Sequence, residues 1–121
     1  KEFFQEVKQL LTDDGVLTAN TFSTSGLYKH ETATYAAAFP WFFNLIERMG
    51  NRVVLTASGP QPEKSELVDV AKNFPYDVEP YGINLVRIAR KATKPRRYEM
   101  NARVLTDQYS PVNLLNAAGI R

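Results

Sequence analysis

The chain has 121 residues, of which 44% are hydrophobic, and this length suits one modest domain or part of one. Its 15 basic and 13 acidic residues leave a net charge of +2, which is too close to balance to indicate a nucleic-acid or membrane partner by itself. The absence of cysteine excludes disulfides and thiolate metal sites, and the single histidine, His30, disfavours a zinc centre, so we expect no metal.

The first predicted elements are a helix and a buried strand. Apolar residues recur at helical spacing near the start of the chain, at Phe3, Phe4, Val7, Leu10 and Leu11. After a tight turn at 13–15, the apolar run GVLTANTF (15–22) predicts a strand, and a second helix is expected from about residue 27. Together they predict one αβα step of a layered α/β sheet, around which the remaining elements are arranged.

The middle of the chain predicts two more helical pieces and a strand. The helix from about residue 27 should end at Pro40. The apolar segment 41–46 then predicts a second, buried helical piece, with Gly50 or Asn51 in the left-handed position that ends it. Residues 52–58 are rich in β-branched side chains and predict a strand.

The second half predicts helices separated by prolines. Pro62 suits the start of a helix that Pro75 ends, and a further helix over 85–92 should stop before Pro95. Residues 103–106 predict a short strand or an extended lead-in. Ser110 and Pro111 form a favourable N-cap and first-turn pair for a final helix that runs to Gly119.

Two features of a complete nucleotide-binding domain are missing from this inventory. The six glycines form no G-x-G-x-x-G turn. The chain also lacks the acidic residue that binds a ribose about twenty residues after such a turn. Two strands are also too few for a stable open sheet. We therefore expect the later half of a larger α/β domain, or a sheet completed by another chain.

Four stretches, in order, resemble the C-terminal half of spermidine synthase-like proteins, the polyamine aminopropyltransferases. They are FFQEVKQLLTDDGVLTANTF, YKHETATYAAAFPWFF, NRVVLTAS and VLTDQYSPVNLL. The resemblance covers nearly all of 2–58 and 103–115 and is weak over 60–100. Its most specific piece is LTDQYSPVNLL, which looks like the closing segment of the bacterial branch whose domain is sometimes joined to membrane transporter helices.

The resemblance implies a fold and an activity. The fold would be part of a Rossmann-like three-layer sandwich of the S-adenosylmethionine-dependent methyltransferase type. The family transfers an aminopropyl group from decarboxylated S-adenosylmethionine to putrescine. Its Gly-rich nucleotide turn, ribose-binding acid and paired aspartates would all lie upstream of residue 1. We therefore expect this chain alone to bind nucleotide poorly and to have little or no transferase activity.

Two groups of residues are candidates for binding the amine substrate. Asn20, Thr21 and Phe22 stand at the carboxyl end of the predicted strand, where open α/β sheets bind ligands. Their alternative role is to cap the next helix. Asp107, Gln108 and Tyr109 match the closing segment, and a carboxylate beside an aromatic ring could attract a cationic amine. Packing of the C-terminal segment against the sheet is the alternative that we favour for this group.

Two further groups of residues are weaker candidates for a functional site. His30 and Glu31 are adjacent on a helix and point apart, so we do not expect them to act as a general-base pair with Tyr28 nearby. The aromatic segment 41–43 should be core rather than a stacking platform or a dimer contact.

Two other functions remain open on the sequence alone. Six basic residues fall between 87 and 97, which allows a nucleic-acid or acidic-lipid contact but is more typical of a solvated surface. The chain could also belong to a methyltransferase-like domain with another acceptor, because fold does not fix function.

Assembly and location follow from exposed surfaces and hydropathy. An exposed sheet edge and apolar helix face favour a homo-oligomer, in particular a dimer. No apolar stretch reaches the roughly 18–20 residues that span a bilayer, and the chain does not start with a secretory signal. We expect a soluble, cytoplasmic chain, whose parent protein could still be fused to membrane helices.

Overall fold

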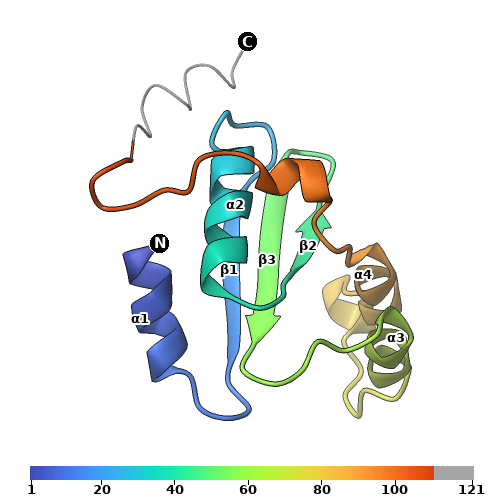
Figure 1. Cartoon of the computed structure of the whole chain (residues 1–121). Coiled ribbons are helices and arrows are strands. Elements are labelled where there is room, and N and C mark those ends of the chain that lie inside the picture. The colour runs from blue at the N-terminus through green and yellow to red at the C-terminus, as the bar shows by residue number, and fades with distance from the viewer. Residues whose placement is uncertain (111–121) are drawn as a thin grey trace.

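The computed structural model describes residues 1–110, which form a small mixed α/β unit and a separate helical lobe (Figure 1). The sheet has three strands, β1 (Val16–Phe22), β2 (Phe43–Ile46) and β3 (Asn51–Ala57), in the order β1-β3-β2. The helices are α1 (Glu2–Leu10), α2 (Tyr28–Ala38), α3 (Lys64–Lys72) and α4 (Leu85–Lys91). Two short 3₁₀ helices, η1 (Glu79–Tyr81) and η2 (Arg97–Met100), complete the described elements.

The sheet contains a parallel crossover with a third strand inserted into it. Both β1 and β2 pair antiparallel with β3, so β1 and β2 run in the same direction. The chain passes from β1 to β2 through α2, which packs against the sheet. This is a βαβ unit whose two parallel strands are separated by β3.

The hydrophobic core lies between α2 and one face of the sheet, which we call the covered face. Its residues come from the second half of α2, from the segment that follows the helix and from β3: Tyr35, Ala38, Phe39, Phe42 and Val54. Phe4 of α1 joins them, with its ring 4.3 Å from that of Tyr35. Because side chains alternate along a strand, every second side chain of β1 points to the opposite face, which we call the open face. Exposed and partly buried residues alternate along β1 accordingly.

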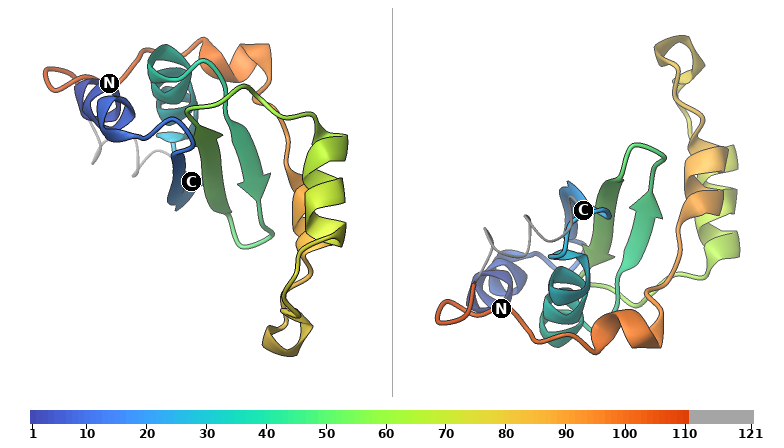
Figure 2. Two further views of the ribbon diagram at one scale, coloured as in Figure 1. Left: turned by 90° about the horizontal axis from the view of Figure 1, so that it is seen from below. Right: turned by 90° about the horizontal axis from the view of Figure 1, so that it is seen from above.

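The lobe of α3, η1 and α4 lies beyond β2, away from β1 (Figures 1 and 2). Neither α3 nor α4 contains a buried residue, and the two helices mainly contact each other. The lobe is tied to the sheet by a two-residue bridge, in which Asn44 and Thr93 exchange backbone hydrogen bonds of 2.7 and 2.9 Å, and by an ion pair between Lys91 of α4 and Glu47, which follows β2 (3.1 Å). These helices therefore flank the sheet and leave the open face of β1 uncovered.

The helical prediction for 41–46 is wrong, because residues 43–46 form the edge strand β2. The segment before it is held extended: the Trp41 indole donates to the carbonyl oxygen of Gly59 (2.8 Å), and the Thr56 hydroxyl donates to that of Trp41 (2.6 Å). A run of six residues is too short for periodicity to distinguish a helix from a strand. Gly50 does adopt a positive φ of 80°, but in the turn between β2 and β3 rather than at a helix end.

The remaining predicted elements are confirmed in type. The structure contains α1, β1, α2, β3, α3 and α4 close to their predicted ranges. Residues 103–106 are extended and belong to no named strand, and only Thr106 forms an isolated bridge, with Tyr109. The final predicted helix lies outside the described residues. The α/β class is thus confirmed, whereas within residues 1–110 helices cover the sheet on one face only.

Candidate functional site

The carboxyl end of β1 presents its three predicted site residues on two different faces. Thr21 lies on the covered face, where its hydroxyl donates to Oε2 of Glu31 (2.6 Å). Asn20 and Phe22 point to the open face, and Phe22 is 59% exposed. Thr21 therefore contacts α2 through the Glu31 side chain and does not cap the helix, whose N-cap residue is Leu27, whereas Asn20 and Phe22 remain available for a ligand or for another part of the protein.

An ion pair between a fully buried arginine and a partly buried glutamate lies directly beneath Thr21. Arg52, opposite Thr21 on β3, is 0% exposed, and its Nη2 is 2.7 Å from the same Glu31 oxygen. Its Nη1 donates to the Thr32 hydroxyl (2.6 Å), and its guanidinium lies 4.5 Å from the centre of the Tyr28 ring. A buried charge needs such partners, because an unpaired one is costly to remove from water. This cluster fixes α2 to the carboxyl end of β1.

The cluster extends to η2 and perturbs two tyrosines. The Tyr28 hydroxyl donates to Oε1 of Glu99 (2.9 Å), whose other oxygen accepts from the backbone N–H of Arg96 (2.8 Å). Burial, followed by the hydrogen bond and charge of Glu99, raises the pKa of Tyr28. Burial and the nearby Glu31 carboxylate raise the pKa of Tyr35 to about 12. Both phenols thus stay protonated at neutral pH and do not act as bases there.

Arg52 was not predicted from the sequence as a functional or structural residue. The signal that could have found it is alternation: Arg52, Val54 and Thr56 fall on one face of the strand, and Val54 is clearly core. A basic residue on that face must be buried with a partner. Which carboxylate supplies the partner depends on how α2 crosses the sheet, and the sequence does not reveal this.

The second predicted group forms a turn that packs against the beginnings of α1 and α2. Thr106 and Tyr109 exchange backbone hydrogen bonds of 3.0 Å, and the Asp107 N–H donates to Glu2 Oε2 (3.1 Å). The Tyr109 ring lies 3.7 Å from the guanidinium carbon of Arg103. Its face thus already holds a cation from the chain itself. Asp107 and Gln108 are exposed and line a cavity of about 310 Å³ together with Glu2 and Thr106.

The two predicted groups are not joined to each other by any interaction seen among residues 1–110. Tyr109 instead lies near His30, with ring centres 6.3 Å apart. His30 donates through Nδ1–H to the carbonyl oxygen of Arg103 (2.8 Å), while Glu31 faces Thr21 and Arg52. His30 and Glu31 therefore serve different contacts, as their adjacent positions on α2 predict.

The structure also describes the aromatic segment 41–43 and the basic residues between 87 and 97. Phe42 and Phe43 are buried, which confirms the core assignment, and Trp41 is half-buried. The basic run is spread over α4, the following loop and η2. Two of its side chains have partners: Lys91 pairs with Glu47 (3.1 Å), and Arg96 donates to the Tyr98 hydroxyl (3.2 Å).

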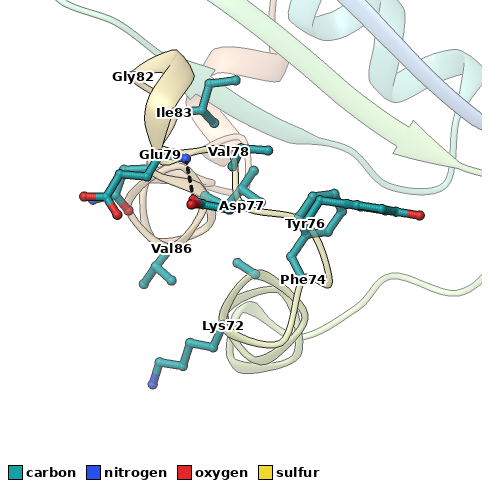
Figure 3. A pocket seen from close by; sticks show the side chains of 12 residues that line it. Lys72, Phe74, Tyr76, Asp77, Val78, Glu79, Gly82, Ile83 and Val86 are labelled. Atoms are coloured by element: carbon teal, nitrogen blue, oxygen red, sulfur yellow. Dashed lines mark hydrogen bonds between the residues drawn. The ribbon is translucent and has the colours of Figure 1, made fainter.

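A cavity of about 600 Å³ lies in the helical lobe (Figure 3). None of the predicted site residues is among those that line it. Phe74, Tyr76, Asp77 and Glu79 are among its lining residues. The Asp77 carboxylate accepts the backbone N–H of Glu79 (3.1 Å), so it is held in a local turn just ahead of η1. In the part of the chain that the structure describes, no three acidic or histidine side chains gather as a metal site would require. Likewise, none of the helices described there combines the length and apolarity needed to cross a membrane.

The fold and the site together define a small mixed α/β unit, with one face of its sheet covered and polar residues at the carboxyl end of β1. Over 117 residues, or 95% of its length, the chain is 42% identical to the polyamine aminopropyltransferase of Vibrio vulnificus strain CMCP6. This confirms the resemblance to spermidine synthase-like proteins. The chain spans only 39% of that relative. No family model matches the chain, and no solved structure matches it.

Proposed function

We propose that this chain is the C-terminal portion of a spermidine synthase-like aminopropyltransferase. The observation that carries the proposal is the 42% identity to a polyamine aminopropyltransferase over 95% of the chain. The parent enzyme would transfer an aminopropyl group from decarboxylated S-adenosylmethionine to putrescine, within a Rossmann-like domain of the methyltransferase type. The crossover from β1 through α2 to the parallel strand β2 supports the proposal that these strands belong to a larger α/β sheet.

The proposed chemistry is a direct displacement. The neutral amine of putrescine attacks the carbon beside the sulfonium, a new C–N bond forms, and the C–S bond breaks to release methylthioadenosine. Such a step depends on holding the amine deprotonated and in line with the electrophilic carbon. Residues outside this chain would bind the nucleoside and activate the amine.

Within this chain, Asn20 and Phe22 are proposed to line the crevice for the substrate. Their support is position: both are on the open face, at the strand end where open α/β sheets bind ligands. We assign Thr21 to positioning, because its hydroxyl is held by Glu31. Asp107 and Gln108 are proposed as a second, exposed contact for the cationic substrate, with Tyr109 fixing their turn.

The test compares this chain with the longer protein that its gene encodes. With putrescine and decarboxylated S-adenosylmethionine, the longer protein should form spermidine and methylthioadenosine, and the 121-residue chain should form little or none. In the longer protein, Asn20→Ala should raise KM for putrescine, and Asn51→Ala, an exposed cross-strand neighbour of Phe22, should not. A longer protein that transfers methyl groups from S-adenosylmethionine instead would overturn the proposal.

A further inference from the structure

We infer that a buried series of contacts couples η2 to the carboxyl end of β1, and that Tyr28 and Glu99 act through it as positioning residues for the amine substrate. Their role in amine binding rests on the proposed function, in which Asn20 and Phe22 line the crevice. Both residues act at a distance from that crevice, through the cluster around Arg52.

The carboxyl end of β1 is held through one carboxylate oxygen. Oε2 of Glu31 accepts from the Thr21 hydroxyl (2.6 Å) and from Nη2 of Arg52 (2.7 Å). Thr21 stands between Asn20 and Phe22 in the strand, so the backbone that carries those two side chains follows a movement of this oxygen. The position of the Glu31 carboxylate therefore affects how Asn20 and Phe22 are presented on the open face.

The Arg52 side chain depends on its neighbours for its own position. It is 0% exposed, and its Nη1 donates to the Thr32 hydroxyl (2.6 Å), but its Nε is buried with no hydrogen-bond partner among the described residues. A guanidinium with a buried, unsatisfied N–H gains a hydrogen bond when it tilts toward an acceptor. The Tyr28 ring, whose centre lies 4.5 Å from the guanidinium carbon, packs against the guanidinium and opposes such a tilt.

The Tyr28 ring is in turn held by η2. Its hydroxyl donates to Oε1 of Glu99 (2.9 Å), and Oε2 of Glu99 accepts from the backbone N–H of Arg96 (2.8 Å). Burial, followed by the hydrogen bond and charge of Glu99, raises the pKa of Tyr28, so the hydroxyl remains a donor at neutral pH. Figures 1 and 2 show η2 beside α2, with which it is in contact. The contacts thus run from η2 through Tyr28, Arg52 and Glu31 to Thr21.

Amide resonances measured by NMR test the coupling without any reaction. Tyr28→Phe removes the hydroxyl that contacts η2 and retains the ring, so in the 121-residue chain it should shift the amide resonances of residues 20–22. Tyr98→Phe is the matched control, because Tyr98 lies in η2 and its hydroxyl accepts from Arg96 (3.2 Å), outside the cluster. It should leave those resonances in place. Unchanged resonances at 20–22 in Tyr28→Phe, or equal shifts in both variants, would overturn the coupling.

Kinetics of the longer protein test the effect on the substrate. Tyr28→Phe should raise KM for putrescine about threefold to tenfold, and change kcat and KM for decarboxylated S-adenosylmethionine by under about twofold. Because the effect passes through the strand end, Tyr28→Phe combined with Asn20→Ala should raise KM for putrescine by less than the product of the separate effects. Tyr98→Phe should leave all these constants unchanged. An unchanged KM for putrescine in Tyr28→Phe, or a full product in the double variant, would overturn the positioning role.

A second variant separates positioning from a general loss of stability. Glu99→Ala removes the same hydrogen bond from the side of η2, and should produce the same resonance shifts and the same rise in KM for putrescine. Thermal unfolding midpoints measured beside the kinetics identify a loosened fold. An equal rise in KM for both substrates, together with a lowered midpoint, would overturn the positioning role.

Failure of the proposed function is recognised separately. If the longer protein forms no spermidine, or if Asn20→Ala leaves KM for putrescine unchanged, then the proposed reaction or the proposed crevice is wrong, and the role in amine binding is overturned with it. The amide resonances of residues 20–22 still decide whether η2 is coupled to β1. If Asn20→Ala raises KM and Tyr28→Phe does not, the proposed function stands and only the positioning role is overturned.

Discussion

The two faces of the sheet differ in what covers them, although they are built from alternating residues of the same strands. On the covered face, Arg52, Val54 and Thr56 of β3 are each 0% exposed beneath α2. On the open face, their neighbours Val53 and Leu55 are only partly buried, and Phe22 of β1 is more than half exposed. A strand whose two faces are both apolar is typical of a sheet buried on both sides.

This difference indicates where the stability of the described chain resides. Burial of apolar area is the main favourable term in folding, and here it is concentrated between α2 and the covered face. Changes on that face should therefore reduce the stability of the 121-residue chain, whereas equivalent changes on the open face should matter mainly in the longer protein proposed above. Four predictions test this contrast, beginning with the largest expected effect.

Removal of Arg52 should have the largest effect. Arg52→Ala empties a fully buried site and leaves the Glu31 carboxylate, which is 24% exposed, without its cation, so it should lower the free energy of unfolding by about 3–5 kcal/mol. Urea denaturation followed by circular dichroism measures this loss. Arg48→Ala removes an exposed arginine from the turn after β2 and should cost under about 0.5 kcal/mol. Similar losses in the two variants would show that the buried pair does not hold the covered face together.

Tyr35 should make the covered face sensitive to alkaline pH. Burial raises its pKa to about 12 in the folded chain, against 10.0 for an ordinary tyrosine, so folding favours the neutral phenol. The corresponding stability is present below pH 10 and is lost as pH rises from about 10 to 12, by up to about 2–3 kcal/mol.

Tyr35→Phe retains the ring and should remove this part of the alkaline decline, measured as unfolding midpoints between pH 9 and 12. Tyr81→Phe is the exposed control, since Tyr81 is 79% exposed. A decline in Tyr35→Phe as steep as in the unmodified chain would contradict the assignment.

The adjacent valines of β3 compare the two faces directly. Val54→Ala empties a site that is 0% exposed and should cost about 2 kcal/mol, because it removes two buried methyl groups and leaves a cavity. Val53→Ala, on the open face, should cost under about 1 kcal/mol in the 121-residue chain. In the longer protein the cost of Val53→Ala should rise toward that of Val54→Ala. Equal costs already in the short chain would contradict the contrast between the faces.

The sequence predicts this architecture well where periodicity is long and unambiguous. The stripe Phe3, Phe4, Val7, Leu10 and Leu11 predicts α1, and the β-branched run 52–58 predicts β3. It fails at 41–46, where the strand is defined by its pairing with β3 across the turn at 47–50, which the spacing of apolar residues within 41–46 does not report. The Trp, Phe and Ile side chains of this segment are in fact ones that strands favour, so the helical prediction also neglected their propensity.

The candidate site was predictable only in part. The position of Asn20 and Phe22 at the end of β1 follows from the strand itself, whereas the capture of Thr21 by Glu31 depends on the placement of α2. The same is true of Tyr109, whose ring is occupied by Arg103, a residue close in sequence but brought over it only by the turn at 106–109. Pairings of this kind arise from packing and are not encoded in spacing.

Gly50 provides the last and smallest test, at the turn where the end of β1 is held against the β2–β3 hairpin. Its φ is +80°, and an added Cβ would lie 2.8 Å from Thr24 Cγ2, so Gly50→Ala combines backbone strain with a close contact and should cost about 1–2 kcal/mol. Gly82→Ala has a similar φ of +72° but meets no atom within 4 Å, so it should show the strain alone. The difference between the two variants in thermal unfolding measures how tightly the Ser23–Thr24 segment is held on the hairpin. No difference would mean that Thr24 moves aside at no cost, so that the Ser23–Thr24 segment is held mainly by the hydrogen bonds of Ser23 to the Gly50 carbonyl oxygen.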